Sequence, residues 1–232
     1  MISGRNRRII NAIQKLNPEY ETLNDLFGMA RAVFEEDDME LPYALKLTKY
    51  VKDMISYLPS SNSLNELYWN ILLWEAPYHF ESFLLYMEKN RPFKKKFYEP
   101  RAKTLKIVVD DLQDLEDGVI EFYGLSMPPR VGKSTICIFF LAWIIGRRPD
   151  SHNAMSGHSG ILADGFFSEV FNLTTSEDYT FSEIFPDVKL ESKSAEKNEL
   201  NYNTPDRFST LTCRLMGHGQ VELIFRKMVI FM

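Results

Sequence analysis

The sequence predicts an α/β fold with a parallel sheet, preceded by a helical N-terminal region. Three observations lead to this prediction. Apolar residues recur at helical spacing through the first 90 residues, strand-like and helix-like segments then alternate, and a loop containing Gly-Lys-Ser joins the first strand to the next helix. We therefore expect a helical region over residues 1–90, a partial α/β domain over residues 91–214, and an aberrant tail over residues 215–232.

The composition is that of an ordinary globular chain. Of 232 residues, 45% are hydrophobic and 25% are charged, which argues against a disordered, collagen-like or disulfide-scaffold protein. The net charge of −5 gives no global signal of nucleic-acid binding. Cys137 and Cys213 have no partner spacing, so we expect reduced intracellular thiols. The polar N-terminus does not resemble a signal peptide, and no apolar run approaches the roughly 20 residues of a membrane span.

Four apolar stripes predict the helices of the N-terminal region. They run over residues 5–16, 23–34, 41–58 and 64–87. Pro18 stops the first helix, and Pro77 interrupts the fourth. Nothing in this region suggests chemistry. We interpret it as a helical bundle that stabilises itself, with Trp69 and Trp74 as core residues rather than a platform for stacking bases.

A basic strip with interleaved aromatic residues follows at residues 88–106. Its members are Lys89, Arg91, Lys94, Lys95, Lys96, Arg101, Lys103 and Lys106, with Phe93, Phe97 and Tyr98. Such a strip can bind a nucleic-acid backbone or a nucleotide base. The alternative is a solvated linker between the helical region and the next domain, and composition alone favours the linker.

The α/β pattern is preceded by one segment with two interpretations. Residues 107–111 look like a buried strand that ends in two acids, but the apolar positions from Leu105 to Leu115 have helical spacing, and Asp117-Gly118 closes the element. We therefore predict an amphipathic helix there. The segments that follow are predicted as strand 120–125, loop 126–133, helix 134–145, strand 153–157, helix 161–173, a polar stretch 174–200, and a strand–turn–strand unit over 200–213.

The loop between strand and helix carries the residues of a phosphate-binding site. Gly132 lets the backbone approach a phosphate, and the first amides of the following helix, with the helix dipole, favour an anion. Lys133 can reach the β- and γ-phosphates, Ser134 can offer its hydroxyl to Mg²⁺, and Thr135 can touch the α-phosphate. Met127 stands where the strict motif has its first glycine. The alternative is a plain turn with an exposed lysine.

Ser126-Met-Pro-Pro-Arg-Val-Gly-Lys-Ser-Thr135 resembles the Walker A motif of large terminase subunits, the DNA-packaging motors of tailed bacteriophages. In that family Pro-Pro-Arg commonly replaces the glycine-rich stretch. The resemblance extends to Phe97-Tyr98-Glu-Pro-Arg101, to the helix from Thr104 to Leu115, to residues 184–186 and to residues 209–214.

The resemblance implies a nucleotide site for ATP and Mg²⁺. Its implied binding residues are Met127, Pro128, Pro129, Arg130, Val131, Gly132, Lys133, Ser134 and Thr135, with Ser134 at the metal and Arg130 placed to sense the γ-phosphate. Tyr98 and Arg101 are implied to lie near the adenine. The implied fold is a RecA-like, additional-strand P-loop ATPase core, incomplete in this chain. The implied partners are double-stranded viral DNA, the small terminase subunit and the portal, in the cytoplasm of a bacterial host and with no membrane.

The acids of such a motor are not evident after the loop. Residues 136–232 contain no strand that ends in Asp followed by a catalytic Glu, and Glu222 precedes its apolar run. In a shifted reading frame, with chosen synonymous codons, residues 215–220 read Asp-Gly-Ser-Trp-Thr-Gly, which fits the family. We therefore expect a truncated, frame-shifted chain that binds nucleotide without turnover. A natural divergent tail, another P-loop ATPase of helicase type, and a non-enzymatic helical module remain the alternatives.

Overall fold

The computed structural model describes the backbone of residues 4–157, 159–203, 209–215 and 228–231. The chain divides into two compact units, Met1–Glu75 and Ala76–Met232. The helical region predicted over residues 1–90 spans this division, because its last helix belongs to the second unit.

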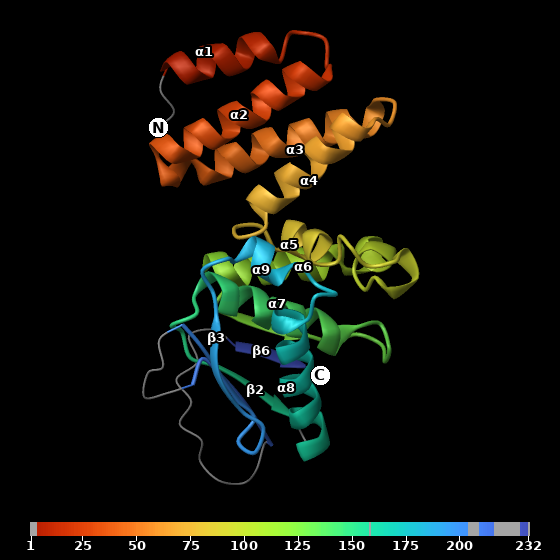
Figure 1. The fold of residues 1–232 in the computed structure, drawn as a ribbon, viewed down its shortest axis with the longest axis vertical. Helices are drawn as coiled ribbons and strands as arrows, with labels where there is room; N and C mark the ends of the chain where they lie inside the picture. Colours follow the sequence, from red (N-terminus) through yellow and green to blue (C-terminus); the bar gives the residue numbers. More distant parts are fainter. Residues whose placement is uncertain (1–3, 158, 204–208, 216–227, 232) are drawn as a thin grey trace. The chain divides into compact units, whose positions relative to one another are not determined.

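The first unit is all-helical in the part that the structure describes (Figure 1). Its elements are α1 (Gly4–Ile13), α2 (Tyr20–Glu36), the 3₁₀ turn η1 (Asp38–Glu40), α3 (Leu41–Tyr57) and α4 (Asn62–Glu75). Each helix contributes the apolar stripe that the sequence predicts, and α2 and α3 pack most extensively. The buried Glu75 carboxylate forms an ion pair with Lys52, which links α4 to α3.

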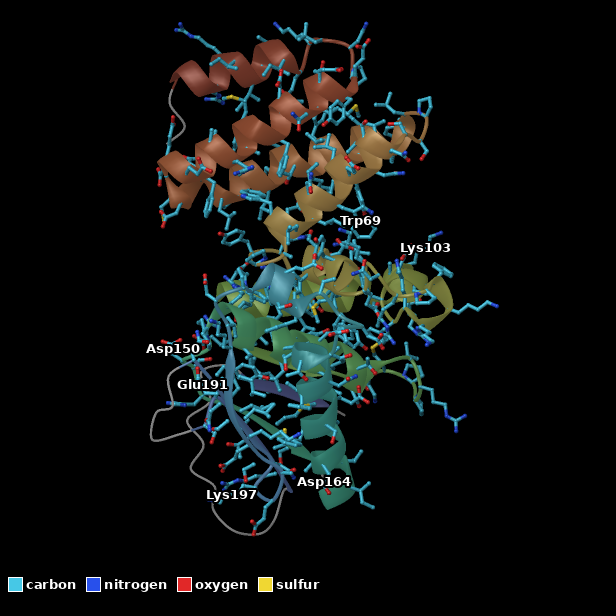
Figure 2. The ribbon with its side chains drawn as sticks, viewed as in Figure 1. Trp69, Lys103, Asp150, Asp164, Glu191 and Lys197 are labelled. Carbon is cyan, nitrogen blue, oxygen red and sulfur yellow. The ribbon has the colours of Figure 1, made fainter. Side chains whose placement is uncertain are left out.

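The ends of the predicted helices and one predicted core residue differ from the structure. Helix α1 ends at Ile13, three residues early, and Leu16 is exposed. Tyr57, the last residue of α3, is also exposed. Trp74 packs against the core and meets Phe27 edge to face, as expected of a core residue. Trp69 is only half-buried at the surface of α4 (Figure 2).

The second unit combines helices with short strands. Its helical elements are α5 (Phe80–Met87), η2 (Phe93–Lys95), η3 (Glu99–Arg101), α6 (Ala102–Asp117), α7 (Lys133–Arg147), α8 (Gly160–Thr175) and α9 (Phe181–Ile184). Helix α6 confirms the helical interpretation of residues 105–117: Leu105, Val109 and Leu112 are buried on one face. Gly118 ends α6 in the left-handed region at φ 77°, where glycine has no steric cost.

The sheet is mixed, which corrects the expectation of a parallel sheet. The strands β2 (Asn153–Gly157), β5 (Leu211–Leu215), β4 (Glu199–Tyr202) and β3 (Leu190–Ser194) lie in the order β2-β5-β4-β3. The β2–β5 pair is parallel, whereas β4 pairs antiparallel with both β5 and β3. The tight turn between β3 and β4, in which Asn198 has φ 53°, imposes the antiparallel direction on that pair. Strand β3 falls in residues 174–200, for which the sequence predicted only a polar stretch.

The strand that leads into the phosphate loop belongs to a separate two-stranded parallel pair. Strand β1 (Phe122–Leu125) pairs with β6 (Met228–Phe231), with Phe122 opposite Met228 and Leu125 opposite Phe231. Part of the tail therefore lies as a strand beside β1, while residues 216–227 lie outside the described residues. The strand–helix–strand–helix order from β1 to α8 matches the predicted alternation.

Helix α7 is the apolar centre of the second unit. Trp143 is fully buried, and its indole nitrogen donates to the carbonyl oxygen of Ala76 at 2.8 Å. Gly146 follows the predicted end of this helix at residue 145 but lies inside α7, and a β-carbon there would meet the Phe185 ring at 2.2 Å. The glycine is thus required for a close approach of Phe185, and not to end the helix. Helix α8 packs against α7, β2 and β5. None of the described helices combines the length and apolarity needed to cross a bilayer.

Both cysteines should react slowly in the folded chain. Cys137 and Cys213 are buried free thiols, and burial raises the pKa of Cys137 and raises that of Cys213 to about 12. At pH 8 we expect a thiol reagent to modify the native chain at least roughly 100-fold more slowly than the chain in urea. Because unfolding lowers these pKa values to about 8.5, stability should also fall as the pH rises above about 9. Rapid modification of both native thiols would contradict the burial of α7 and β5.

Candidate functional site

The candidate site is the connection between β1 and α7. Leu125 anchors the end of β1 in the core, and residues 126–132 then lead without regular structure to the first turn of α7. Gly132 is the N-cap residue, with φ 108°, and its carbonyl oxygen accepts the first helical hydrogen bond from Ile136. As a glycine, the N-cap residue has no side chain with which to cap the helix. The backbone N–H groups of its first turn, Lys133 to Thr135, are therefore available to a ligand bound at the N-terminus of the helix.

A pocket of about 310 Å³ lies at this helix start. Its volume is within the range of about 300–1,000 Å³ that is usual for small-molecule sites. The lining residues are Phe97, Arg101, Arg130, Gly132, Lys133, Ser134 and Thr135. Arg101, Arg130 and Lys133 thus converge with two hydroxyls, and no carboxylate lines the pocket within the described part of the chain. Such a lining favours an anion with several negative charges.

Arg130 adopts a backbone conformation that is uncommon for an arginine. Its φ is 66°, in the left-handed region, directly after Pro128 and Pro129. The two prolines restrict the preceding backbone, because each fixes φ near −65°. Strain of this kind costs about 1–3 kcal/mol and is found preferentially at functional sites. The chain thus turns at Arg130, whose side chain lines the pocket.

The structure brings some of the predicted residues together and separates others. Arg101, Arg130, Gly132, Lys133, Ser134 and Thr135 meet in the pocket, but Met127, Pro128, Pro129 and Val131 are not among its lining residues. Tyr98, expected near the adenine, is fully buried, and its hydroxyl donates to Glu81 at 2.7 Å. Burial, and then the hydrogen bond to Glu81, raises the pKa of Tyr98 above its usual value. Tyr98 thus belongs to the core beneath the site.

Phe97 is the pocket residue that the sequence did not assign to the site. Its ring stacks on Phe139 of α7, with centroids 5.6 Å apart and an angle of 14° between the planes. Arg101 lies over the same ring, 5.5 Å from its centroid, and donates through Nη1 to the carbonyl oxygen of Phe97 at 2.9 Å. The available signal was the short separation along the chain: Phe97 lies in a bend just before η3, and Arg101 is the last residue of η3, four positions later.

Gly132→Ala should impair the site for two reasons. A β-carbon at Gly132 would meet the Phe97 ring at 2.6 Å, and alanine is strained at φ 108°. We expect the free energy of unfolding to fall by about 1–3 kcal/mol, and nucleotide affinity to fall with it. In a urea-unfolding cycle with Phe97→Ala, the double variant should lose less than the sum of the two single losses, because the clash is removed. Strict additivity would show that Phe97 does not contact Gly132.

The two acids that end the strand-like run of residues 107–111 have other partners. Asp110 forms an ion pair with Lys106 on α6, and Asp111 accepts a hydrogen bond from Tyr123 of β1. Burial, and then this hydrogen bond, raises the pKa of Tyr123. Over the described residues, no group of three His, Cys, Asp or Glu side chains is arranged to hold a metal ion.

The basic strip of residues 88–106 has several different environments. Arg91 pairs with Glu88, Lys96 with Glu99, and Lys106 with Glu81 and Asp110. Lys103 is exposed at the start of α6 (Figure 2). The strip is therefore not a simple solvated linker: Arg101 lines the pocket, and Phe97 covers one side of it.

Comparisons with protein-family models, with curated proteins and with solved structures found no match to this chain.

Proposed function

We propose that the chain binds ATP with Mg²⁺ through residues 127–135. The observation that carries this proposal is the pocket at the start of α7, where three cationic side chains and two hydroxyls converge on a helix N-terminus. A polyphosphate supplies the matching charge, and the aromatic wall at Phe97 is compatible with a ligand that also has an organic part.

Each lining group has a role in this proposal. The amides that open α7 and the helix dipole hold the β-phosphate, and Lys133 neutralises the β- and γ-phosphates. Arg130 and Arg101 add bidentate donors to the phosphate oxygens. The exposed Ser134 hydroxyl suits Mg²⁺, which prefers oxygen ligands and takes its remaining ones from phosphates and water.

We further propose that this ATP site belongs to the ATPase segment of a DNA-packaging motor of the large-terminase type. The resemblance of residues 126–135 to that family's Walker A motif supports it, as do the runs at residues 97–101, 184–186 and 209–214. Viral DNA, the small terminase subunit and the portal are the partners that this proposal implies. Because no carboxylate lines the described pocket, we propose binding without rapid turnover.

The test is an equilibrium titration of the chain with ATP, with and without Mg²⁺, followed by a phosphate-release assay. We expect saturable binding with a Kd on the order of 10 μM to 1 mM, competed by inorganic tripolyphosphate. Absence of binding at millimolar ATP would overturn the proposal and favour the non-enzymatic helical module. Sustained phosphate release would refute binding without rapid turnover, and with it the interpretation that the site holds no catalytic acid.

A further inference from the structure

The segment that carries Phe97 and Arg101 is tied to the core by one buried carboxylate. Glu88 follows the last residue of α5 and is 1% exposed. Its carboxylate accepts hydrogen bonds from the backbone N–H of Phe97 at 2.8 Å and of Tyr98 at 3.0 Å. Two consecutive amides of the pocket segment are thus bound by a side chain nine and ten residues earlier in the chain.

The Glu88 carboxylate also forms an ion pair with Arg91. Its Nη1 donates to Glu88 at 3.0 Å and to the hydroxyl of Tyr179 at 2.7 Å, and its guanidinium stacks over the Tyr179 ring. Tyr179 in turn meets Phe139 edge to face, and Phe139 stacks on Phe97. The contacts form a closed circuit from Glu88 through Arg91 and the aromatic rings back to Phe97.

The same circuit determines where the Arg101 guanidinium lies. Arg101 is exposed, and the carbonyl oxygen of Phe97 holds its Nη1. This carbonyl belongs to the peptide between Phe97 and Tyr98, whose N–H donates to Glu88. One Glu88 bond therefore orients the peptide that orients the arginine, and Arg101 lines a pocket that Arg130 and Lys133 also line.

We propose that Glu88 is a positioning residue for the polyphosphate site, acting through the peptide of Phe97 and Tyr98 to hold Arg101 at the pocket. This inference rests on the proposed function and adds to it a residue that touches no ligand. A site binds its ligand more tightly when a flexible, exposed arginine is already held in the binding orientation, because that arginine then loses less conformational entropy on binding. Glu88 supplies that fixation from within the core.

The experiment is a double-mutant cycle in which Mg-ATP and inorganic tripolyphosphate are titrated at low salt. Arg101→Ala should lower the affinity for both ligands on the order of tenfold, which is the usual effect of losing a charge-assisted contact. Glu88→Ala should cause a similar loss, and Glu88→Gln a smaller one, because its amide oxygen can still accept one backbone N–H. The double variant Glu88→Ala/Arg101→Ala should be no weaker than either single variant within about twofold, since both changes remove the same contact.

A matched cycle with Arg130 separates positioning from general destabilisation. Arg130 also lines the pocket but comes from the loop after β1, so the losses of Glu88→Ala and Arg130→Ala should multiply. If the losses of Glu88→Ala and Arg101→Ala also multiply, or if Glu88→Ala leaves both affinities unchanged, the inference is overturned. If the wild-type chain binds neither ligand, the proposed function itself fails. If Glu88→Ala does not fold, the same cycle is run with Glu88→Gln. Losses that multiply with those of Arg101→Ala, or affinities for both ligands that do not change, would again overturn the inference.

Discussion

Lys133→Ala should lower the affinity for Mg-ATP by at least roughly 100-fold. Lys133 is the first residue of α7 and lines the pocket beside Gly132. In the proposed complex its ammonium group contacts the β- and γ-phosphates, and losing two charge-assisted contacts costs on the order of 3 kcal/mol, with each 1.4 kcal/mol equal to tenfold. Calorimetric or fluorescence titration of the two proteins measures this difference directly.

Lys103→Ala provides the matched control for that titration. Lys103 is an exposed lysine of α6 in the same unit, and it is not among the residues that line the pocket. The same truncation there should change the affinity by less than about twofold, because an exposed charge outside the site is screened by solvent and salt. Equal affinities of the wild type and Lys133→Ala would show that the loop before α7 is not the nucleotide site.

Glu116→Ala should destabilise the second unit by about 3 kcal/mol. The Glu116 carboxylate on α6 is buried and accepts hydrogen bonds from Arg147 Nη1 at 3.0 Å and from Arg148 Nη2 at 2.7 Å. Removing it leaves two arginines at the end of α7 without their shared counter-charge. Loss of one partner of a buried ion pair costs about 3–5 kcal/mol, and the lower value applies here because the arginines are 25% and 31% exposed.

Amide hydrogen exchange is the suitable measurement, because the chain has two units and need not unfold in one step. Protection of the α6 and α7 amides should fall in Glu116→Ala, while that of α2 and α3 should not change. Asp114→Ala, an exposed carboxylate on the same helix, should leave both sets within about 0.5 kcal/mol of the wild type. Equal effects of the two substitutions would mean that Glu116 does not hold α7 against α6.

Much of the helical structure follows from local sequence. The apolar spacing of residues 105–115 is enough to distinguish the α6 helix from a buried strand, because the four-residue repeat lines one face only when the backbone is helical. In the same way, β1, the loop and α7 could be predicted from an apolar run, a glycine before a lysine, and a second apolar run. Each of these signals depends on residues less than about 20 positions apart.

The sheet was predicted less well, and the reason is physical. Strand β3 reads Leu-Glu-Ser-Lys-Ser and has no buried residue, because it is the last strand of the described sheet and is held by backbone pairing with β4. A strand that buries no side chain leaves no apolar pattern in its sequence. The pairing of β1 with β6, about 100 residues later, likewise rests on backbone hydrogen bonds that no side-chain pattern records.

By itself, the sequence determined most of the longer helices, the loop, and the cluster of Gly132, Lys133, Ser134 and Thr135, because each of these depends on residues that are close together in the chain. Only the tertiary structure decided that Phe97 rather than Tyr98 meets that cluster, whereas Arg101, which the resemblance implied to lie near the adenine, lines the same pocket. A buried carboxylate, Glu88, binds the amides of both residues, and the Phe97 ring lines the pocket while the Tyr98 ring lies in the core. Hydrogen bonds to the backbone do not depend on which side chain the amide carries, so the sequence around Phe97 holds no record of them.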